Sequence, residues 1–457
     1  MAHTIPPRIL DRIEDSGKCV RDPVLEYIDM APEIEALVDT VDFQRLRQIS
    51  QLGHVSLVYP GARHSRFEHS LGVYHLAKRF LQRLLRSDPP LTLDLEDVKV
   101  CTAAALLHDI GHYPFSHVLE ELTSFFAHHE ARGRRLILDP EGEIHRVLRK
   151  KVGIDPERVA NVVDPCGPER EIPERDRLLA RILSGTLDPD KVDYLLRDSL
   201  YCGVPFGLAV NKGRLINSIT YDPTRQKLAI TDKGICAIES LIFTNYLMYR
   251  NVYWHHTARA ATAMFKRVVW EVVSHPECRL TPSDFERIDE HQLMDILGQQ
   301  IEKLGNPDLA RFFTELTRRR LYKVARSFQA QEKTTSSFMH VFYDLYRHSD
   351  KRHRMEVELA RGCGRRLRRN LPDNAVLIDI PAFHKTLQVD LDVRHGARSG
   401  RGSEEWVDFG DPRVSRLKEY LVDNFESHAK VFRVFTLDDP AVIEDVGRSV
   451  KRQLMAG

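Results

Sequence analysis

The stretch "LLHDIGHYPFSH", residues 106–117, decides what the rest of the sequence is expected to build. It places His108 beside Asp109 at the end of an apolar helical run, and His112 and His117 follow closely. If the helical turn continued past Asp109, His112 would share a face with His108. Neutral imidazoles and carboxylates are natural ligands for divalent first-row metals. A lone buried histidine would more often be structural, but this cluster predicts a metal or catalytic site.

A second stretch, "RHSRFEHSLGV" at residues 63–73, crowds polar side chains just before an apolar helical run. A stable metal site needs more ligands than one adjacent His–Asp pair, and His69 is a candidate for the next one. We expect the other two unassigned polar residues to have supporting positions. Glu68 is predicted in a salt bridge and His64 at the surface.

A third stretch, "LDPDKVDYLLRD", supplies an acidic candidate ligand. Asp190, Tyr194 and Asp198 are spaced four residues apart, which puts them on one helical face, and Lys191 lies beside them. Carboxylate, phenol and carboxylate do not form a normal core stripe. The alternative interpretation is a salt-bridged, exposed helix face. The coincidence with the His–Asp cluster favours a functional face, with Asp190 as a metal ligand.

Length and charge limit the classes of protein that the sequence fits. The chain has 457 residues, 42% apolar and 29% charged residues and a formal net charge of +1. These values describe a globular protein with no overall bias toward nucleic acid or membrane. Two basic stretches, "TRRRLYK" and "RGCGRRLRRN", are either solvated helix faces or patches that meet polyphosphate or nucleic acid.

Cysteine usage and hydropathy indicate a reducing compartment. The seven cysteines are scattered and form no CxxC pair, which argues against a disulfide framework and a cysteine-ligated zinc site. The first ten residues, "MAHTIPPRIL", contain no apolar signal region, and no apolar run approaches the length of about 18 residues needed to span a bilayer. We therefore expect a cytoplasmic protein.

Hydrophobic periodicity predicts a mainly α-helical fold. Helices are expected over most of residues 1–330, which form a mostly helical core, and residues 331–457 form a smaller mixed α/β lobe. "SITYDPTRQKLAIT" predicts a hairpin, and "NAVLIDIPAF" and "AKVFRVFTL" predict strands. The Gly-, Ser- and Arg-rich "RHGARSGRGSEEW" predicts a mobile loop.

Five stretches, in this order and approximate spacing, resemble the HD-domain dNTP triphosphohydrolases: "FQRLRQISQLG", "YPGARHSRFEHSLGV", "LLHDIGHYPFSH", "HHE" and "DPDKVDYLLRDSLYCGV". The resemblance covers residues 18–260 and fades toward the C-terminus. It implies an HD helical core and a metal-dependent conversion of dNTP and water to deoxynucleoside and triphosphate. No SAM domain precedes the motifs, so a bacterial-type architecture is expected.

The resemblance also implies roles for individual residues by motif position. The implied metal ligands are His69, His108, Asp109 and Asp190. The implied catalytic histidines are His112, His117 and His129, with His128 as the alternative to His129. The implied substrate-binding residues are Gln51, Leu52, Arg66, Lys191, Tyr194, Asp198 and His255.

These roles suit hydrolysis at the α-phosphorus. Two histidines and two aspartates leave open metal positions for water and a phosphate oxygen, and Fe, Mn, Zn and Co all fit, with Mg²⁺ expected on the substrate phosphates. Arg66 and Lys191 offset phosphoryl charge, and any of the catalytic histidines serves as proton donor to the departing triphosphate. Tyr194 under the ribose 2′ position leaves little room for a 2′-hydroxyl, which favours deoxynucleotides.

The resemblance implies a regulatory site as well. Lys18, Asp39, Gln44 and Arg47 occupy positions of a guanine-nucleotide activator site between subunits, filled by dGTP or GTP. Here "DPVLEY" replaces the family's "DPIHG"-like stretch. The alternative is that "FQRLRQ" is simply an amphipathic helix with outward Arg and Gln.

The resemblance further implies a homo-oligomer, from dimer to hexamer, and no membrane partner. Two other functions stay open. One is an HD phosphohydrolase for another nucleotide, such as a monophosphate, a cyclic dinucleotide or a nucleic acid end. The other is a nucleotide-sensing or nucleic-acid-binding protein with a vestigial site, which the intact set of metal ligands argues against.

Overall fold

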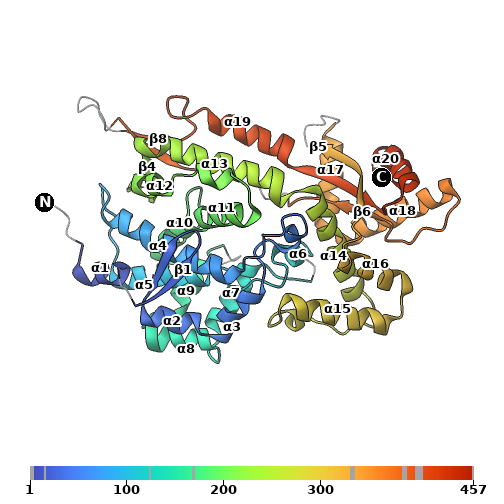
Figure 1. Ribbon diagram of the computed structural model, residues 1–457. Coiled ribbons are helices and arrows are strands. Elements are labelled where there is room, and N and C mark those ends of the chain that lie inside the picture. The colour runs from blue at the N-terminus through green and yellow to red at the C-terminus, as the bar shows by residue number, and fades with distance from the viewer. Residues whose placement is uncertain are drawn as a thin grey trace.

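The computed structural model describes residues 5–14, 17–122, 125–166, 170–329, 335–382, 389–396 and 405–454. Within these ranges the fold is mainly helical with three small sheets, as the sequence predicts. Figure 1 shows the N-terminal two thirds as a mainly helical body. Among the described residues, no helix has both the length and the apolarity to cross a bilayer.

The helical body is built from many short helices and a few long ones. Its α-helices are α1 Pro7–Glu14, α2 Pro32–Val38, α3 Val41–Arg45, α4 Arg66–Leu85, α5 Leu95–Leu107, α6 His117–Glu120, α7 His129–Leu138, α8 Glu143–Val147, α9 Pro156–Val163, α10 Glu174–Leu183, α11 Pro189–Cys202, α12 Lys212–Ser218, α13 Ile235–Met248 and α14 His256–Val273. The one-turn 3₁₀ and π segments are η1 Leu46–Gln48, η2 Gly53–Leu57, η3 Leu148–Val152, η4 Phe206–Ala209, η5 Asp232–Gly234 and η6 Tyr249–Tyr253. The hairpin of β1 Lys18–Asp22 and β2 Glu26–Met30 was not predicted from the sequence.

Helices α4, α5 and α11 form the centre of this body, and their boundaries follow from local sequence. Asp94 and Asp97 form a reciprocal capping box that starts α5. Asp188 caps α11 by accepting the backbone N–H of Lys191, and Gly203 in the left-handed region ends it. Helix α5 is apolar all round and packs against both α4 and α9, so its C-terminal end is fixed deep inside the protein.

The C-terminal elements form a three-stranded sheet of order β5–β9–β6 and add β7 and β8 to the hairpin β3–β4 of the body, which gives a four-stranded sheet. The helices are α15 Glu290–Leu304, α16 Pro307–Thr317, α17 Thr335–Arg347, α18 Ser349–Leu367, α19 Leu417–Asn424 and α20 Pro440–Leu454, with the short segments η7 Pro282–Phe285 and η8 Phe425–Ala429. The strands are β3 Ile219–Asp222, β4 Lys227–Thr231, β5 Lys323–Gln329, β6 Val376–Asp379, β7 Asp392–His395, β8 Glu405–Asp408 and β9 Val431–Thr436. In Figure 1, α17, α18 and α20 lie at one end of the helical body, and β8 and α19 run along it beside β4 and α13.

Strand pairing confirms most of the sequence predictions for β structure. The predicted hairpin is the antiparallel pair β3–β4, and the two predicted late strands are β6 and β9. The predicted loop at residues 394–406 is wrong at both ends, because they pair with each other in β7 and β8, while residues 397–404 lie outside the described residues. The predicted boundary at residue 330 falls just after β5, which pairs with β9, and it stays a prediction.

Helix α14 joins the helical body to the C-terminal elements. It follows helix α13, to which the π segment η6 connects it. α14 is buried along most of its length and packs against α15, α16, β5 and β6. Arg259 of α14 donates to both carboxylate oxygens of Asp379 on β6, and Lys266 pairs with Glu121. A buried charge network therefore reinforces the apolar contact along α14.

The close approach of α4 to α11 gives a stability prediction. A Cβ on Gly72 of α4 would lie 1.9 Å from Asp193 Oδ1 and 2.6 Å from an Arg197 nitrogen, both on α11. We predict that Gly72→Ala lowers the free energy of unfolding by about 1–3 kcal/mol, because overpacking outweighs the gain in helix propensity. Gly298→Ala in α15 is the control, since its Cβ would make only ordinary contact with Phe313. Urea unfolding compares the two, and equal effects would contradict the prediction.

Candidate metal and hydrolytic site

Four predicted metal ligands converge from three helices. His69 lies on α4, His108 and Asp109 follow the end of α5, and Asp190 lies in the first turn of α11. His69 Nε2 is 3.0 Å from Asp190 Oδ1 and 3.6 Å from Asp109 Oδ2. His108 Nε2 is 3.4 Å from Asp109 Oδ1 and 3.8 Å from Asp190 Oδ1. The ligand atoms of His69, His108 and Asp109 are close enough together to hold a metal ion, and Asp190 lies beside the two histidines.

The hydrogen bonds behind both imidazoles suit a metal. His108 Nδ1 lies 2.9 Å from the carbonyl of Ala105, so it carries the proton and leaves Nε2 as a lone pair, and that buried Nε2 has no hydrogen-bond partner. His69 Nδ1 lies 2.9 Å from Asp193 Oδ2 and is fixed in the same way. Burial opposes a charged imidazole, yet the Asp190 and Asp193 carboxylates raise the pKa of His69 to about 10, so the cluster favours a cation.

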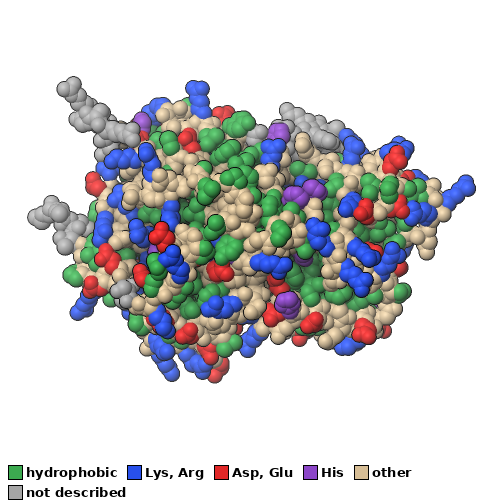
Figure 2. All heavy atoms as spheres, viewed as in Figure 1, with side chains coloured by type: hydrophobic (Ala, Val, Ile, Leu, Met, Phe, Trp, Pro, Cys, Tyr) green, Lys and Arg blue, Asp and Glu red, His purple; other side chains and the backbone are tan. Residues whose placement is uncertain are grey.

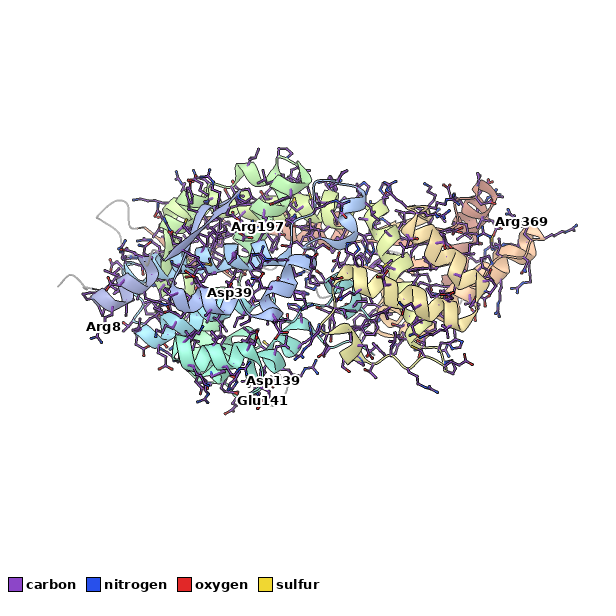
Figure 3. The ribbon with its side chains drawn as sticks, turned by 60° about the horizontal axis from the view of Figure 1, so that its bottom comes forward. Arg8, Asp39, Asp139, Glu141, Arg197 and Arg369 are labelled. Carbon is purple, nitrogen blue, oxygen red and sulfur yellow. The ribbon has the colours of Figure 1, made fainter. Side chains whose placement is uncertain are left out.

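Asp193 belongs to a buried ion chain that the sequence analysis missed. Its carboxylate also accepts from Arg197 Nε at 2.8 Å, and Arg197 NH1 donates to Asp22 of β1 at 2.8 Å. Arg197 and Asp193 are fully buried, and Figure 3 labels Arg197 within α11. The available signal was the position of Asp193 three residues after Asp190 on the same helix, which turns it toward the partner helix.

A second cluster lies against the first. His112 and His129 stack with ring centroids 3.8 Å apart, and His112 Nε2 is 3.1 Å from Asp109 Oδ1. Glu120 lies among the histidines, with carboxylate oxygens 3.0 Å from His129 Nδ1 and 3.3 Å from His117 Nδ1. The three predicted catalytic histidines are therefore together. The ligand atoms of His112, His117, Glu120 and His129 are also close enough to hold a metal.

The charges in this second cluster are set by Glu120, another residue missed from the sequence. Burial disfavours its charged form, but His129 and His117 hold the pKa of the Glu120 carboxyl well below its usual range. Burial likewise opposes a charged His129, and Glu120 raises its pKa. By contrast, burial and the nearby Arg66 lower the pKa of His112 to about 3. Glu120 follows His117 by three residues, and that spacing was the only available signal.

The two predicted phosphate-binding cations lie beside the metal ligands. Arg66 is buried, pairs with Asp109 and donates from Nε to Ser116 Oγ at 2.8 Å. Lys191 Nζ is 2.7 Å from Asp188 Oδ2, and although burial opposes its charge, Asp188 raises the pKa of Lys191. Both side chains are held by carboxylates at the edge of the cluster.

Two sequence expectations for residues 63–73 need correction. His64 is not at the surface: it is 1% exposed, and its Nε2 lies 2.7 Å from Asp198 Oδ1. The prediction was wrong because the partner of the imidazole lies on α11, and a local sequence pattern does not show a contact between such distant segments. Glu68, predicted in a salt bridge, accepts a hydrogen bond from the hydroxyl of Tyr201 at 2.9 Å.

The predicted sugar-binding residues form a neighbouring group. Asp198 Oδ2 accepts from the Tyr253 hydroxyl at 2.7 Å, and the rings of Tyr194 and Tyr253 meet edge to face at 6.3 Å. Leu52 is partly buried against the core, and Gln51 Oε1 is buried without a hydrogen-bond partner. These residues border α11 on the side of Asp198.

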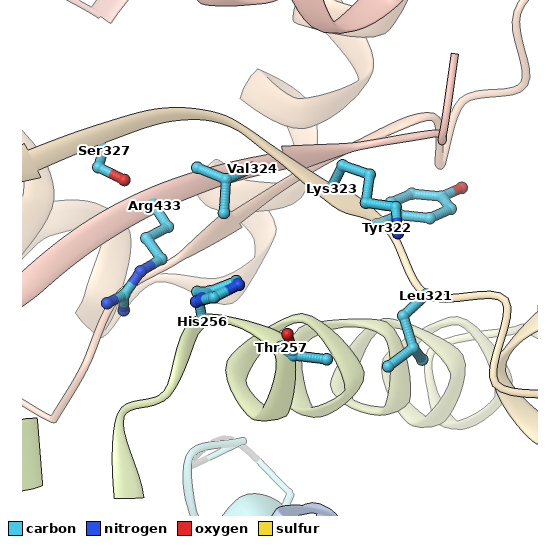
Figure 4. Close-up of a pocket in the computed structure, with 8 residues that line it drawn as sticks. All are labelled: His256, Thr257, Leu321, Tyr322, Lys323, Val324, Ser327 and Arg433. Atoms are coloured by element: carbon cyan, nitrogen blue, oxygen red, sulfur yellow. The ribbon is translucent and has the colours of Figure 1, made fainter. Parts of the chain in front are cut away.

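The last predicted substrate residue, His255, lies near a different cavity. It caps α14, where its Nδ1 accepts the backbone N–H of Thr257 at 3.3 Å, and it stacks on His256 at 4.4 Å. Between α14, β5 and β9 lies a cavity of about 520 Å³ (Figure 4), lined by His256, Thr257, Leu321, Tyr322, Lys323, Val324, Ser327 and Arg433. None of these residues belongs to the metal or histidine clusters.

The four predicted activator residues lie on β1, on α3 and around these elements. Exposed Lys18 pairs with Glu35 at 3.1 Å, and Asp39, labelled in Figure 3, adds to the charges that raise the Lys18 pKa. Gln44 Oε1 accepts from Arg47 Nε at 2.8 Å, which links those two side chains. The site role and the amphipathic-helix alternative both stay open.

The ion chain behind His69 gives a testable prediction. Asp193→Asn keeps the shape of the side chain but weakens its hold on His69, so the affinity for a divalent metal should fall by about 10–100-fold. Chelator competition with Mn²⁺ measures this change. The matched control is Asp295→Asn on the exposed face of α15, which should leave affinity unchanged. Equal affinities of the two variants would remove Asp193 from the metal site.

Comparison with known proteins identifies the family. The HD domain model matches residues 66–183, and the HD associated region model matches residues 210–401.

The uncharacterized protein YwfO of Bacillus subtilis is 30% identical over 383 residues, which is 75% of this chain and 84% of that protein. Human deoxynucleoside triphosphate triphosphohydrolase SAMHD1 is 28% identical over 276 residues, 55% of this chain and only 44% of that protein. A crystal structure of a hypothetical protein from Aquifex aeolicus superposes with a TM-score of 0.69 at 25% identity, over 95% of this chain and 99% of that one. The chain therefore belongs to the HD-domain phosphohydrolases in which an HD-associated region follows the HD domain.

Proposed function

We propose that the protein is a metal-dependent dNTP triphosphohydrolase that converts dNTP and water to deoxynucleoside and triphosphate. The observation that carries this proposal is the convergence of His69, His108, Asp109 and Asp190 beside a buried histidine–glutamate cluster. The relatives named as deoxynucleoside triphosphate triphosphohydrolases, in human and in Dictyostelium discoideum, support the substrate class.

The ligand set would hold one divalent ion, and Fe, Mn, Zn and Co all suit two nitrogens and two oxygens. When bound, the ion supplies positive charge to the phosphoryl oxygens and makes water more acidic. Arg66 and Lys191 would add positive charge on the phosphate chain, with Mg²⁺ as companion ion on the substrate. Arg66 would have to share its guanidinium between Asp109 and a phosphate oxygen.

Atom balance fixes where the proton must go. Water adds to the α-phosphorus and the bond from that phosphorus to the 5′-oxygen breaks, so the 5′-oxygen of the deoxynucleoside needs a proton. The expectation that the proton goes to a departing triphosphate is wrong, because the deoxynucleoside is the leaving group and the α-phosphorus stays in the triphosphate. His117 is the best-placed donor, because its side chain is 51% exposed while His112 is fully buried and His129 is largely buried. Glu120 would hold the His117 imidazole in place.

The sugar would be recognised by Gln51, Leu52, Tyr194 and Asp198. The fixed Asp198 carboxylate is suited to accept the one hydrogen of a 3′-hydroxyl. The Gln51 side-chain amide, whose buried Oε1 position has no partner, would turn so that its N–H donates to the hydroxyl oxygen. Tyr194 would fill the space below the 2′ position. His255 is proposed to contact substrate from the N-terminal end of α14.

Product analysis tests the reaction class. With Mn²⁺ and four dNTPs, the wild type should release inorganic triphosphate, and His69→Ala and Asp109→Ala should reduce turnover by at least about 100-fold, because each removes a metal ligand. His348→Ala, a change at a half-exposed histidine outside the clusters, is the control. Chromatography identifies the products.

Two results would contradict the assignment. Release of pyrophosphate or orthophosphate would indicate another HD phosphohydrolase reaction, on a different nucleotide or at a different phosphorus. Equal turnover of dGTP and GTP would refute the deoxyribose selectivity assigned to Tyr194.

We also propose that a guanine nucleotide, dGTP or GTP, binds Lys18, Asp39, Gln44 and Arg47 at a subunit interface of a homo-oligomer. If so, dGTP should abolish a lag or sigmoidal rate in the hydrolysis of another dNTP. Asp39→Ala combined with Arg47→Ala should raise the dGTP concentration needed by about 10-fold or more, since each removes a charged hydrogen bond. Rate curves that are hyperbolic and insensitive to dGTP would contradict this site.

A nucleic-acid-binding role receives less support from the basic stretches. In the stretch at residues 361–370, Arg361, Arg366 and Arg369 pair with carboxylates of neighbouring elements, so much of their charge is used internally. Figure 2 shows basic and acidic side chains interspersed over the viewed face, in keeping with the near-neutral net charge. The cytoplasmic location stays a prediction.

A further inference from the structure

His64 occupies a position that its sequence context does not explain. It precedes α4, is 1% exposed, and lies with its Nε2 2.7 Å from Oδ1 of Asp198, which is itself 1% exposed. A buried carboxylate is costly unless donors satisfy it. The donor here comes from a segment more than a hundred residues away in the chain, so the contact sets the position of Asp198 relative to the loop before α4.

The other oxygen of Asp198 is held from a third segment. Tyr253, at the end of η6, donates from its hydroxyl to Asp198 Oδ2 at 2.7 Å. Donors on both oxygens fix the plane of the carboxylate. Each oxygen still has a lone pair, so the carboxylate remains able to accept one more hydrogen bond from a ligand.

The ring of His64 is itself fixed. It stacks on Tyr201 with centroids 4.5 Å apart, and the Tyr201 hydroxyl donates to Glu68 on α4. The imidazole therefore has little freedom to turn away from Asp198, and its position fixes the orientation of that carboxylate.

His64 also contacts Gln51, the second polar side chain of the group. The backbone N–H of Gln51 donates to the carbonyl of His64 at 3.0 Å, and Gln51 Oε1 is buried with no hydrogen-bond partner. A buried amide without a partner is unfavourable, and a ligand hydroxyl would satisfy it by accepting from the amide N–H once the amide is turned. His64 thus connects, through its backbone and its ring, the two side chains that would bind one hydroxyl, with Asp198 accepting from it and Gln51 donating to it.

We propose that His64 is a positioning residue, acting through Asp198, that determines how strongly the site selects a sugar bearing a 3′-hydroxyl. This inference rests on the proposed function, in which Asp198 accepts a hydrogen bond from the 3′-hydroxyl of a deoxynucleotide and the Gln51 amide donates one to it. Without the His64 contact, Asp198 loses one of its two fixed points, and selectivity against a 3′-deoxy sugar falls.

The test compares a dNTP with the matching 2′,3′-dideoxy triphosphate. His64→Phe keeps an aromatic ring against Tyr201 but removes the donor, whereas His64→Gln keeps a donor. Because sites built to bind a hydroxyl reject analogues that lack it, the wild type should prefer the dNTP by about 100-fold or more in kcat/KM. His64→Phe should reduce this ratio by about 10-fold or more, through loss on the dNTP only, and His64→Gln should retain most of it.

Each outcome separates this inference from the proposed function. A wild type that releases no triphosphate from any dNTP would refute the proposed function and the inference with it. A wild type that hydrolyses both substrates equally would overturn the inference alone. Equal losses on both substrates in His64→Phe would show a purely structural role. If His64→Phe does not fold, as thermal unfolding would reveal, His64→Leu, which also lacks a donor, replaces it with the same expectation.

Discussion

The structure depends on bringing His69, His108 and Asp109, whose ligand atoms lie within 4.8 Å of one another, beside Asp190, which is 3.0 Å from His69 and 3.8 Å from His108. Uncompensated, such a cluster of buried polar groups would be strongly destabilising. The apolar helix α5 delivers His108 and Asp109 from the centre of the body, and α4 and α11 bring His69 and Asp190 to them. The capping residues that begin α5 and α11, and the contacts of α4 with both helices, hold these four residues together.

Buried charge networks extend outward from that point. On one side, Asp193, Arg197 and Asp22 connect His69 to the β1–β2 hairpin. On the other side, the Glu120 carboxylate contacts His117 and His129, and the adjacent Glu121 pairs with Lys266 of α14. Helix α14 in turn carries Arg259, which binds Asp379 of the C-terminal sheet. The C-terminal elements are thus joined to the histidine cluster through a few buried ion pairs. Removing either partner of such a pair would strongly destabilise the folded protein, because the other charge would be left buried and unpaired.

The sequence predicted the parts of this arrangement that are written in local pattern. Helical spacing and the adjacent His–Asp pair predicted the ligands that meet, and turn residues predicted the β3–β4 hairpin. Side chains whose role depends on a distant partner were missed or misplaced. His64 reads as a surface residue until Asp198 is brought beside it, and Glu120 and Asp193 read as ordinary helix charges. The strands β7 and β8 were missed for the same reason, because β7 pairs with β4, which lies far away in the sequence.

The central claim is that water attacks the α-phosphorus of a dNTP at the His69–His108–Asp109–Asp190 cluster. Hydrolysis of dGTP in ¹⁸O-labelled water by the Mn²⁺-loaded protein, followed by mass spectrometry of the products, tests it directly. The account predicts one ¹⁸O atom in the inorganic triphosphate and none in the deoxyguanosine. Label in the 5′-hydroxyl of deoxyguanosine, or in pyrophosphate or orthophosphate, would contradict it.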